Sequence, residues 1–209
     1  MKQKDTKAEI LDAAEDLFAR RGPNAVSLRQ IIARAKVNLA AIHYHFGSKE
    51  SLMQAVLARR LVPLNAERLA LLEEAGRQSR CVPLEKILEA LVGPALRLSR
   101  DPKKGGSEFM RLLGRCYTEP DDNIQAMLNR QVAAVAERFM PEFQKALPNV
   151  APVDLIWRLH FLVGAMAHTM ADAERLRKFS EGACDPDDTE GTIQKLVTFL
   201  AAGMRAKVK

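Results

Sequence analysis

The stretch "SLRQIIARAKVNLAAIHYHFGSKESL", residues 27–52, contains two short segments with helix signals at their ends. Ser27 and Gln30 have the spacing of a capping box, which predicts a helix that begins here and runs to about Ala35. A second helix is expected to begin after Asn38, as its N-cap, and to end at Gly47. Two short helices joined by a turn of about three residues follow the helix-turn-helix plan. The stretch therefore predicts this motif.

The second helix of the motif has an apolar face and a more polar face. Ile42 and Phe46 are separated by one helical turn, so a single face can bury both of them. The core of the motif is expected to contain these two residues together with Leu28, Ile32 and Val37. The opposite face cannot be buried with them, and the residues expected to point outward are Ala40, Ala41, His43, Tyr44 and Lys49.

Helix signals continue on both sides of the motif. The segment "TKAE", residues 6–9, fits another capping box with Thr6 as N-cap, and apolar residues follow at helical spacing until Gly22. Ser48 caps a fourth, longer helix, and further helices are predicted near residues 84–100, 107–117, 122–146, 154–179 and 189–206. The predicted fold is all-α, with about nine helices. A three-helix helix-turn-helix domain is expected at 1–50, joined to a larger helical domain for effector binding and dimerisation at 51–209.

Positive charge is concentrated near the N-terminus. The chain has a formal net charge of +6, and residues 1–60 contain 11 lysines and arginines against 6 acidic residues, whereas residues 61–209 contain 21 against 20. A basic segment beside an almost neutral remainder favours contact with a polyanion such as DNA. Charge alone also fits an ordinary solvated basic face.

The exposed face of the second motif helix has side chains suited to a DNA major groove. Ala40 and Ala41 are small enough to allow close approach to base pairs. His43 can reach a base edge or a phosphate, and Tyr44 can reach a backbone oxygen. The full set of candidate DNA-contacting residues is Ser27, Arg29, Asn38, Ala40, Ala41, His43, Tyr44, His45 and Lys49.

The two histidines of this helix do not form a metal site. His43 and His45 point about 200° apart around the helix axis, so they cannot share an ion. His45 has two open interpretations, a phosphate contact, or capping or packing against the first helix. No metal and no other cofactor is predicted.

Residues 27–52, and "HYHFGSKESL" above all, resemble the DNA-binding segment of the TetR family of bacterial transcriptional regulators. The resemblance implies DNA contact or motif support by Tyr44, His45 and Lys49, and a recognition surface that includes Ala40, Ala41 and His43. Two positions depart from the family pattern. Lys36 stands where a glycine is usual, which implies a left-handed backbone penalty of about 1 kcal/mol. His43 stands where a tyrosine is common.

The last two predicted helices are suited to a two-fold interface. The segment "DLIWRLHFLVGAMAHTMADAERL", residues 154–176, is apolar almost all round and has small residues that allow close helix contact, namely Gly164, Ala165, Ala167 and Ala171. The final helix has an apolar stripe formed by Ile193, Leu196, Val197, Leu200 and Met204. We expect a homodimer with a four-helix interface, as the resemblance also implies. A fully intramolecular core is the alternative.

A small-molecule pocket is expected among the fourth to eighth helices. Methionine and aromatic side chains adapt to a hydrophobic ligand, and the candidate ligand-binding residues are Phe109, Met110, Leu113, Cys116, Tyr117 and Met127. Each of them also fits plain core packing. The segments "NLAAIHYHFGSK" and "QAVLARRLVPL" resemble a fatty-acid-responsive subgroup of the family, which implies an acyl or other hydrophobic effector. Pro63 is expected to kink the fourth helix where a ligand could tilt the DNA-reading half.

These observations predict a ligand-responsive repressor that binds a palindromic operator as a homodimer and is released by a small hydrophobic effector. A non-specific DNA-binding or architectural protein is one alternative. An all-helical enzyme is another, although no catalytic constellation emerges. Because no targeting segment or long apolar run is evident and the three cysteines are far apart, a soluble cytoplasmic protein without membrane contact is expected.

Overall fold

The computed structural model describes residues 5–101, 105–118, 122–171 and 173–207. Over these residues the chain forms helices and no strand, which confirms the predicted all-α class. The chain divides into two compact units. The first comprises Met1–Pro63 and Ser107–Gln131, and the second comprises Leu64–Gly106 and Val132–Lys209. The predicted division of function at residues 50 and 51 stays a prediction.

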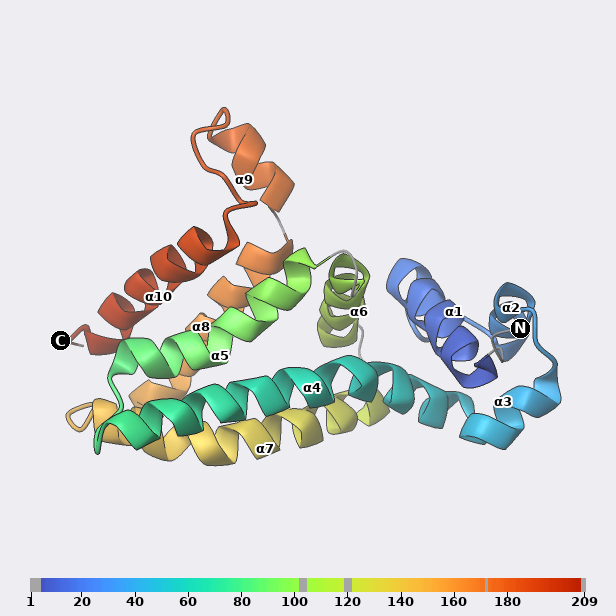
Figure 1. The fold of residues 1–209 in the computed structure, drawn as a ribbon, viewed down its shortest axis with the longest axis horizontal. Coiled ribbons are helices and arrows are strands. Elements are labelled where there is room, and N and C mark those ends of the chain that lie inside the picture. Colours follow the sequence, from blue (N-terminus) through green and yellow to red (C-terminus); the bar gives the residue numbers. More distant parts are fainter. Residues whose placement is uncertain (1–4, 102–104, 119–121, 172, 208–209) are drawn as a thin grey trace. The chain divides into compact units, whose positions relative to one another are not determined.

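The first unit begins with three helices, α1 (Thr6–Arg21), α2 (Leu28–Ala35) and α3 (Leu39–Phe46), as Figure 1 shows. It also contains the first part of α4 (Lys49–Gln78), nearly all of α6 (Gly106–Thr118) and the beginning of α7 (Asp122–Ala146). Helix α1 packs against α2 and α3. The three helices share a core whose most deeply buried side chains are Ile10, Phe18, Val26, Ile31 and Ile42. The helix-turn-helix prediction is confirmed.

The N-cap of α1 differs from the prediction. The cap is Asp5, whose carboxylate accepts a hydrogen bond from the backbone N–H of Ala8 over 3.2 Å, and Thr6 is already inside the helix. A carboxylate is the better partner for this end because it also carries a negative charge towards the positive end of the helix dipole.

The helix-turn-helix has the predicted caps. The hydroxyl of Ser27 accepts from the N–H of Gln30 over 3.3 Å, and the side chain of Gln30 accepts from the N–H of Ser27 over 2.8 Å. Asn38 caps α3 by accepting from the N–H of Ala41 over 2.9 Å. Lys36, in the turn, has φ 56° and ψ 40°, a left-handed conformation that glycine adopts most readily.

The second unit is built on α5 (Leu84–Arg100) and contains the remainder of α4 and α7. It also contains α8 (Pro152–Ala171), α9 (Ala173–Phe179) and α10 (Thr189–Arg205). The interval 154–179, expected as one helix, is described as α8 and α9. Helix α5 packs against α10 and α8, and the core includes Ile87, Leu88, Val92, Phe143, Leu155 and Leu162. Figure 1 shows α9 extending away from α5 and α10.

The apolar stripe of α10 is buried within the chain. Ile193, Leu196, Val197, Leu200 and Met204 all belong to the core of the second unit. This stripe is therefore covered by α5 and its neighbours. The opposite face of α10, where Phe199 is 70% exposed, stays open to another partner.

The three internal prolines do not end their helices. Pro63, Pro94 and Pro141 lie inside α4, α5 and α7, which continue past them. No helix in the described part of the chain is long and apolar enough to cross a membrane. All three cysteines are free, and Cys116 is buried as a small apolar residue would be.

Candidate nucleic-acid interface

Helix α3 exposes one continuous face. Leu39, Ala40, His43 and Tyr44 are all exposed, and Tyr44 is 86% exposed. Ile42, on the other side of the helix, is fully buried, while Phe46 and Ala41 are half-buried. The exposed residues follow the helical period, so they form a stripe rather than scattered positions. This stripe, Leu39, Ala40, His43 and Tyr44, is called the α3 face below.

His43 is held in place by the end of its own helix. Its Nδ1 lies 2.9 Å from the carbonyl oxygen of Gly47, the C-cap residue, and the N–H of Gly47 donates to the carbonyl of His43 over 3.0 Å. Gly47 has φ 76°, a conformation that a residue with a Cβ atom adopts only at a cost. The glycine therefore ends α3 and aims its carbonyl at the imidazole.

His45 supports the α3 face from the side. Its ring meets that of Tyr44 edge-on, with the centroids 5.0 Å apart and the planes at 77°, and it lies 6.1 Å from the ring of Phe46. An edge-to-face pair restricts both rings. His45 is half-buried, and both of these contacts lie within α3, so packing against the first helix and a phosphate contact both stay predictions.

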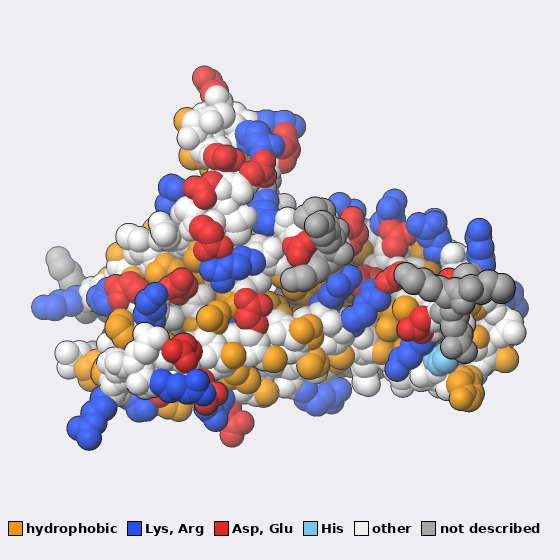
Figure 2. Space-filling view, in the orientation of Figure 1, with side chains coloured by type: hydrophobic (Ala, Val, Ile, Leu, Met, Phe, Trp, Pro, Cys, Tyr) orange, Lys and Arg blue, Asp and Glu red, His pale blue; other side chains and the backbone are white. Residues whose placement is uncertain are grey.

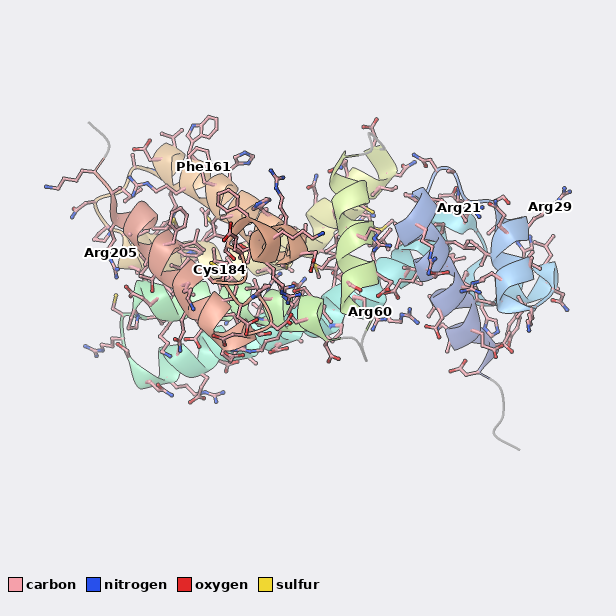
Figure 3. All side chains as sticks on the ribbon, turned by 90° about the horizontal axis from the view of Figure 1, so that it is seen from above. Arg21, Arg29, Arg60, Phe161, Cys184 and Arg205 are labelled. Carbon is pink, nitrogen blue, oxygen red and sulfur yellow. The ribbon has the colours of Figure 1, made fainter. Side chains whose placement is uncertain are left out.

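The remaining predicted contact residues surround the α3 face. Arg29 is exposed on α2 and extends away from α1, as Figure 3 shows. Lys49, the first residue of α4, is half-buried at a helix N-terminus, where backbone N–H groups favour an anion. Ser27 and Asn38 are both exposed, but their side-chain oxygens already cap α2 and α3.

A buried ion-pair cluster fixes α1 to α4 in this unit. The carboxylate of Glu15, only 4% exposed, accepts hydrogen bonds from the guanidiniums of Arg59 and Arg60, the latter over 3.1 Å. Arg59 also donates to Asp12 over 2.6 Å. Burial by itself lowers the pKa of Arg59, but hydrogen bonds and charge from Glu15 and Asp12 together raise that pKa above its ordinary value. The cluster therefore holds α1, the helix that packs against α2 and α3, in place against α4.

The surface of the motif is mainly basic. Figure 2 shows lysine and arginine side chains over α1 and α2, and a histidine beside hydrophobic side chains at α3. Arg20, Arg21, Arg29, Arg34 and Lys36 are exposed, and two of these arginines, Arg20 and Arg34, share the carboxylate of Asp16. The structure thus retains the positive surface that a polyanion requires.

One member of the α3 face was absent from the sequence-based set. Leu39 is 49% exposed at the first position of α3 and lies one turn before His43. The signal that could have found it is its place four residues before His43, which puts it on the exposed side of the helix. A leucine there can contact the methyl group of thymine.

The candidate ligand-binding residues lie on α6 and α7 in the first unit. Phe109, Cys116 and Met127 are buried, and Met110 and Leu113 are half-buried. The side chain of Tyr117 lies outside the described residues. Gln125 donates to the carbonyl of Cys116 over 2.8 Å, which joins α7 to α6. The described members of this set are thus buried or half-buried on two helices of the same unit, and their binding role stays a prediction.

A cavity of about 360 Å³ is present in the second unit, and more than half of its lining residues are charged. It lies between the end of α4 and α7 and includes Arg77, Arg80, Arg138, Glu142 and Lys145. None of the candidate ligand-binding residues lines it. Within the described residues, no group of three or more potential ligands could hold a metal ion.

The fold and the α3 face together define a helix-turn-helix regulatory protein. Residues 10–56 match the family model described as bacterial regulatory proteins of the tetR family, and residues 89–203 match the model of the tetracyclin repressor-like C-terminal domain. The chain therefore belongs to the TetR family of bacterial regulators, which are transcriptional regulators and not enzymes.

Two curated relatives show how far the sequence similarity extends. An HTH-type transcriptional regulator of Pseudomonas putida, TtgW, is 39% identical over 137 residues, which is 66% of this chain and 90% of that one. An HTH-type transcriptional repressor of Mycobacterium tuberculosis is 53% identical over 55 residues, 26% of this chain. That match spans only 29% of the repressor's length.

The similarity of fold covers nearly the whole chain. The regulator FadR of Bacillus subtilis, solved in complex with stearoyl-CoA, has a TM-score of 0.67 with 13% sequence identity, and the match covers 94% of this chain and 98% of that chain. At this identity the comparison establishes the fold alone.

Proposed function

We propose that this protein represses transcription by binding a palindromic DNA operator through the α3 face. The observation that supports this most directly is the α3 face itself, which combines small, aromatic and hydrogen-bonding side chains beside a basic surface. A helix presented in this way fits the width of the major groove. Arg29, Lys49 and Tyr44 would contact the flanking phosphates and fix the helix in register. Binding to DNA implies a cytoplasmic location.

A palindromic operator calls for a homodimer, and α8 offers the surface for it. Its outward stripe includes Ile156, Trp157 and Phe161, with Phe161 63% exposed and, in Figure 3, directed away from α5. The rings of Trp157 and Phe161 stack with centroids 5.9 Å apart. Gly164 follows one turn later and has open space around it. A second copy of α8 would cover this stripe, with Phe199 of α10 beside it.

The effector is proposed to be a small hydrophobic molecule. Helices α6 and α7 supply adaptable side chains for such a ligand, and those that are buried or half-buried are Phe109, Met110, Leu113, Cys116 and Met127. The fold neighbour FadR binds stearoyl-CoA, which is consistent with an acyl ligand. A ligand that binds better to the DNA-free conformation would release the operator.

Selection of bound duplexes from a random DNA pool tests operator binding. The wild-type protein should enrich an inverted repeat, and Tyr44→Ala should lose much of that enrichment because the α3 face loses its aromatic phosphate contact. Phe179→Ala is the matched control, since Phe179 is 89% exposed on α9, far along the chain from α3. Equal affinity for all duplexes would instead support the non-specific alternative.

A further inference from the structure

The hydrogen bond between His43 and Gly47 decides which imidazole nitrogen carries the proton. Nδ1 lies 2.9 Å from the carbonyl oxygen of Gly47. A carbonyl oxygen can only accept a hydrogen bond, so Nδ1 must donate its N–H. A neutral imidazole has a single N–H, which leaves Nε2 with a lone pair. The fold therefore makes the outer nitrogen of His43 a hydrogen-bond acceptor.

The same ring is available to an external partner. His43 is exposed, and within the described part of the chain the carbonyl of Gly47 is the only hydrogen-bond partner of its imidazole ring. The backbone N–H of Gly47 donates to the backbone carbonyl of His43 over 3.0 Å, which fixes the position of the Gly47 carbonyl that the ring contacts. Ala40, one turn earlier, is exposed and too small to shield the ring. The acceptor is thus both oriented and accessible.

We propose that His43 determines operator specificity by accepting a hydrogen bond from the exocyclic amino group of adenine or cytosine. The inference rests on the proposed operator binding. In the major groove only N6 of adenine and N4 of cytosine donate hydrogen bonds. Phosphate oxygens, O6 and N7 of guanine and O4 of thymine all accept, so each of them would repel the Nε2 lone pair.

This assignment separates His43 from its phosphate-contacting neighbours. A tyrosine at this position would offer a hydroxyl that donates to a phosphate oxygen. A neutral histidine bonded to Gly47 cannot do so without gaining a second proton. The α3 face therefore divides into Tyr44, which fixes the helix on the backbone, and His43, which distinguishes bases with an amino group from bases without one.

Deletion of single amino groups from the operator tests the proposal. Each adenine of the selected half-site is replaced in turn by purine and each cytosine by its analogue without the 4-amino group. Affinity is then measured at about pH 8, where an ordinary imidazole is neutral. The proteins are wild type, His43→Phe and His43→Leu, which lack the acceptor, and His43→Gln, whose amide oxygen can accept. Circular dichroism identifies any variant that is not folded. If either His43→Phe or His43→Leu does not fold, the other serves as the variant without an acceptor.

One position of each half-site is expected to respond. Loss of its amino group should weaken binding by wild type and His43→Gln about three- to tenfold, and should leave binding by His43→Phe and His43→Leu unchanged. Comparison with these variants subtracts any effect of the analogue on the duplex itself. If an operator is found but every amino group affects all four proteins alike, the role of His43 is overturned and operator binding stands. If no operator is enriched, both are overturned.

Discussion

Arg97 and Glu190 join α5 to α10 through a two-point ion pair. Nε and Nη2 of Arg97 donate to the two carboxylate oxygens of Glu190 over 2.7 and 2.8 Å. At the other end of the same helices, Arg205 forms an equivalent pair with Glu85. The two helices are therefore antiparallel, and each carboxylate lies in a first turn and each guanidinium in a last turn, which is favourable for both helix dipoles. The pairs fix the orientation in which Phe199 faces outward.

These pairs predict a loss of stability in acid. Hydrogen bonds from Arg205 and Arg97 lower the pKa values of Glu85 and Glu190 in the folded protein. A carboxyl group with a lowered folded pKa stabilises the protein above its unfolded pKa, and this contribution is lost as the pH falls through the folded value. Between about pH 6 and about pH 3 the melting temperature of wild type should fall further than that of the double variant E85Q/E190Q.

The size of this effect should be small because all four side chains are more than one-third exposed to solvent. Each pair is expected to contribute at most about 1 kcal/mol. The control is E137Q/E181Q, which removes two exposed carboxylates that form no ion pair within the described residues. It should follow wild type through the titration. An identical acid response of the two double variants would contradict the prediction.

The buried cluster on α1 and α4 predicts a larger effect. Glu15→Ala removes the carboxylate that pairs with Arg59 and Arg60 and leaves both guanidiniums partly buried without it. Nε of Arg59 is already buried without a hydrogen-bond partner in the described structure. The loss of Glu15 would therefore add to the unpaired polar groups of this arginine. The free energy of unfolding, measured in urea, should fall by about 2–4 kcal/mol.

Asp12→Asn is the control for this variant. Asp12 pairs with the same arginine, but its side chain is 71% exposed, so water can replace the lost contact. Its cost should stay below about 1 kcal/mol. Equal losses in the two variants would show that burial of Glu15 does not decide the stability of the cluster.

Helix boundaries in the motif could be predicted because the cap residues act locally. Ser27, Gln30 and Asn38 form the expected side-chain bonds, and Gly47 ends α3 as its lack of a Cβ allows. The N-cap of α1 was assigned to Thr6 instead of Asp5 because both residue types accept from a helix N–H, and sequence spacing alone does not choose between neighbours.

Features that depend on packing between distant residues could not be predicted. The apolar stripe of α10 looks the same whether α5 or a second copy covers it, and only the structure assigns it to α5. The bond from His43 to Gly47 depends on a single rotamer and on the backbone angle of a glycine. The exposure of Leu39 follows from the rotation of α3 about its axis, which the core around Ile42 sets.

Lys36 predicts a stabilising substitution. Its left-handed backbone is strained for a residue with a Cβ atom, so Lys36→Gly should raise the free energy of unfolding by about 0.5–1 kcal/mol. Lys36→Ala keeps the strain and removes only the charge. The melting temperatures of the two variants therefore separate the effect of backbone strain from that of the lost charge. A melting temperature of Lys36→Gly no higher than that of Lys36→Ala would argue against strain at this turn.

The stripe on α8 predicts the oligomeric state. Phe161→Glu places a charge at the proposed two-fold interface and should convert a dimer to a monomer in sedimentation velocity, with a parallel loss of operator affinity. Phe179→Glu introduces the same charge at a phenylalanine of α9 that is even more exposed, and it should leave the dimer intact. Dissociation by both variants, or by neither, would remove α8 from the interface.

Pro63 predicts how the effector signal passes along α4. The proline has no N–H to bond the carbonyl one turn before it, so α4 is locally weaker at the residue where the two compact units are divided. Pro63→Ala should leave operator affinity within about twofold of wild type, because Pro63 is outside the α3 face. The stiffer helix should transmit less tilting, so a higher concentration of long-chain acyl-CoA thioester should be needed to release the operator. Pro141→Ala, at another exposed proline, inside α7, is the control for the gain of a helical hydrogen bond. Equal release midpoints for wild type and Pro63→Ala would place the hinge elsewhere.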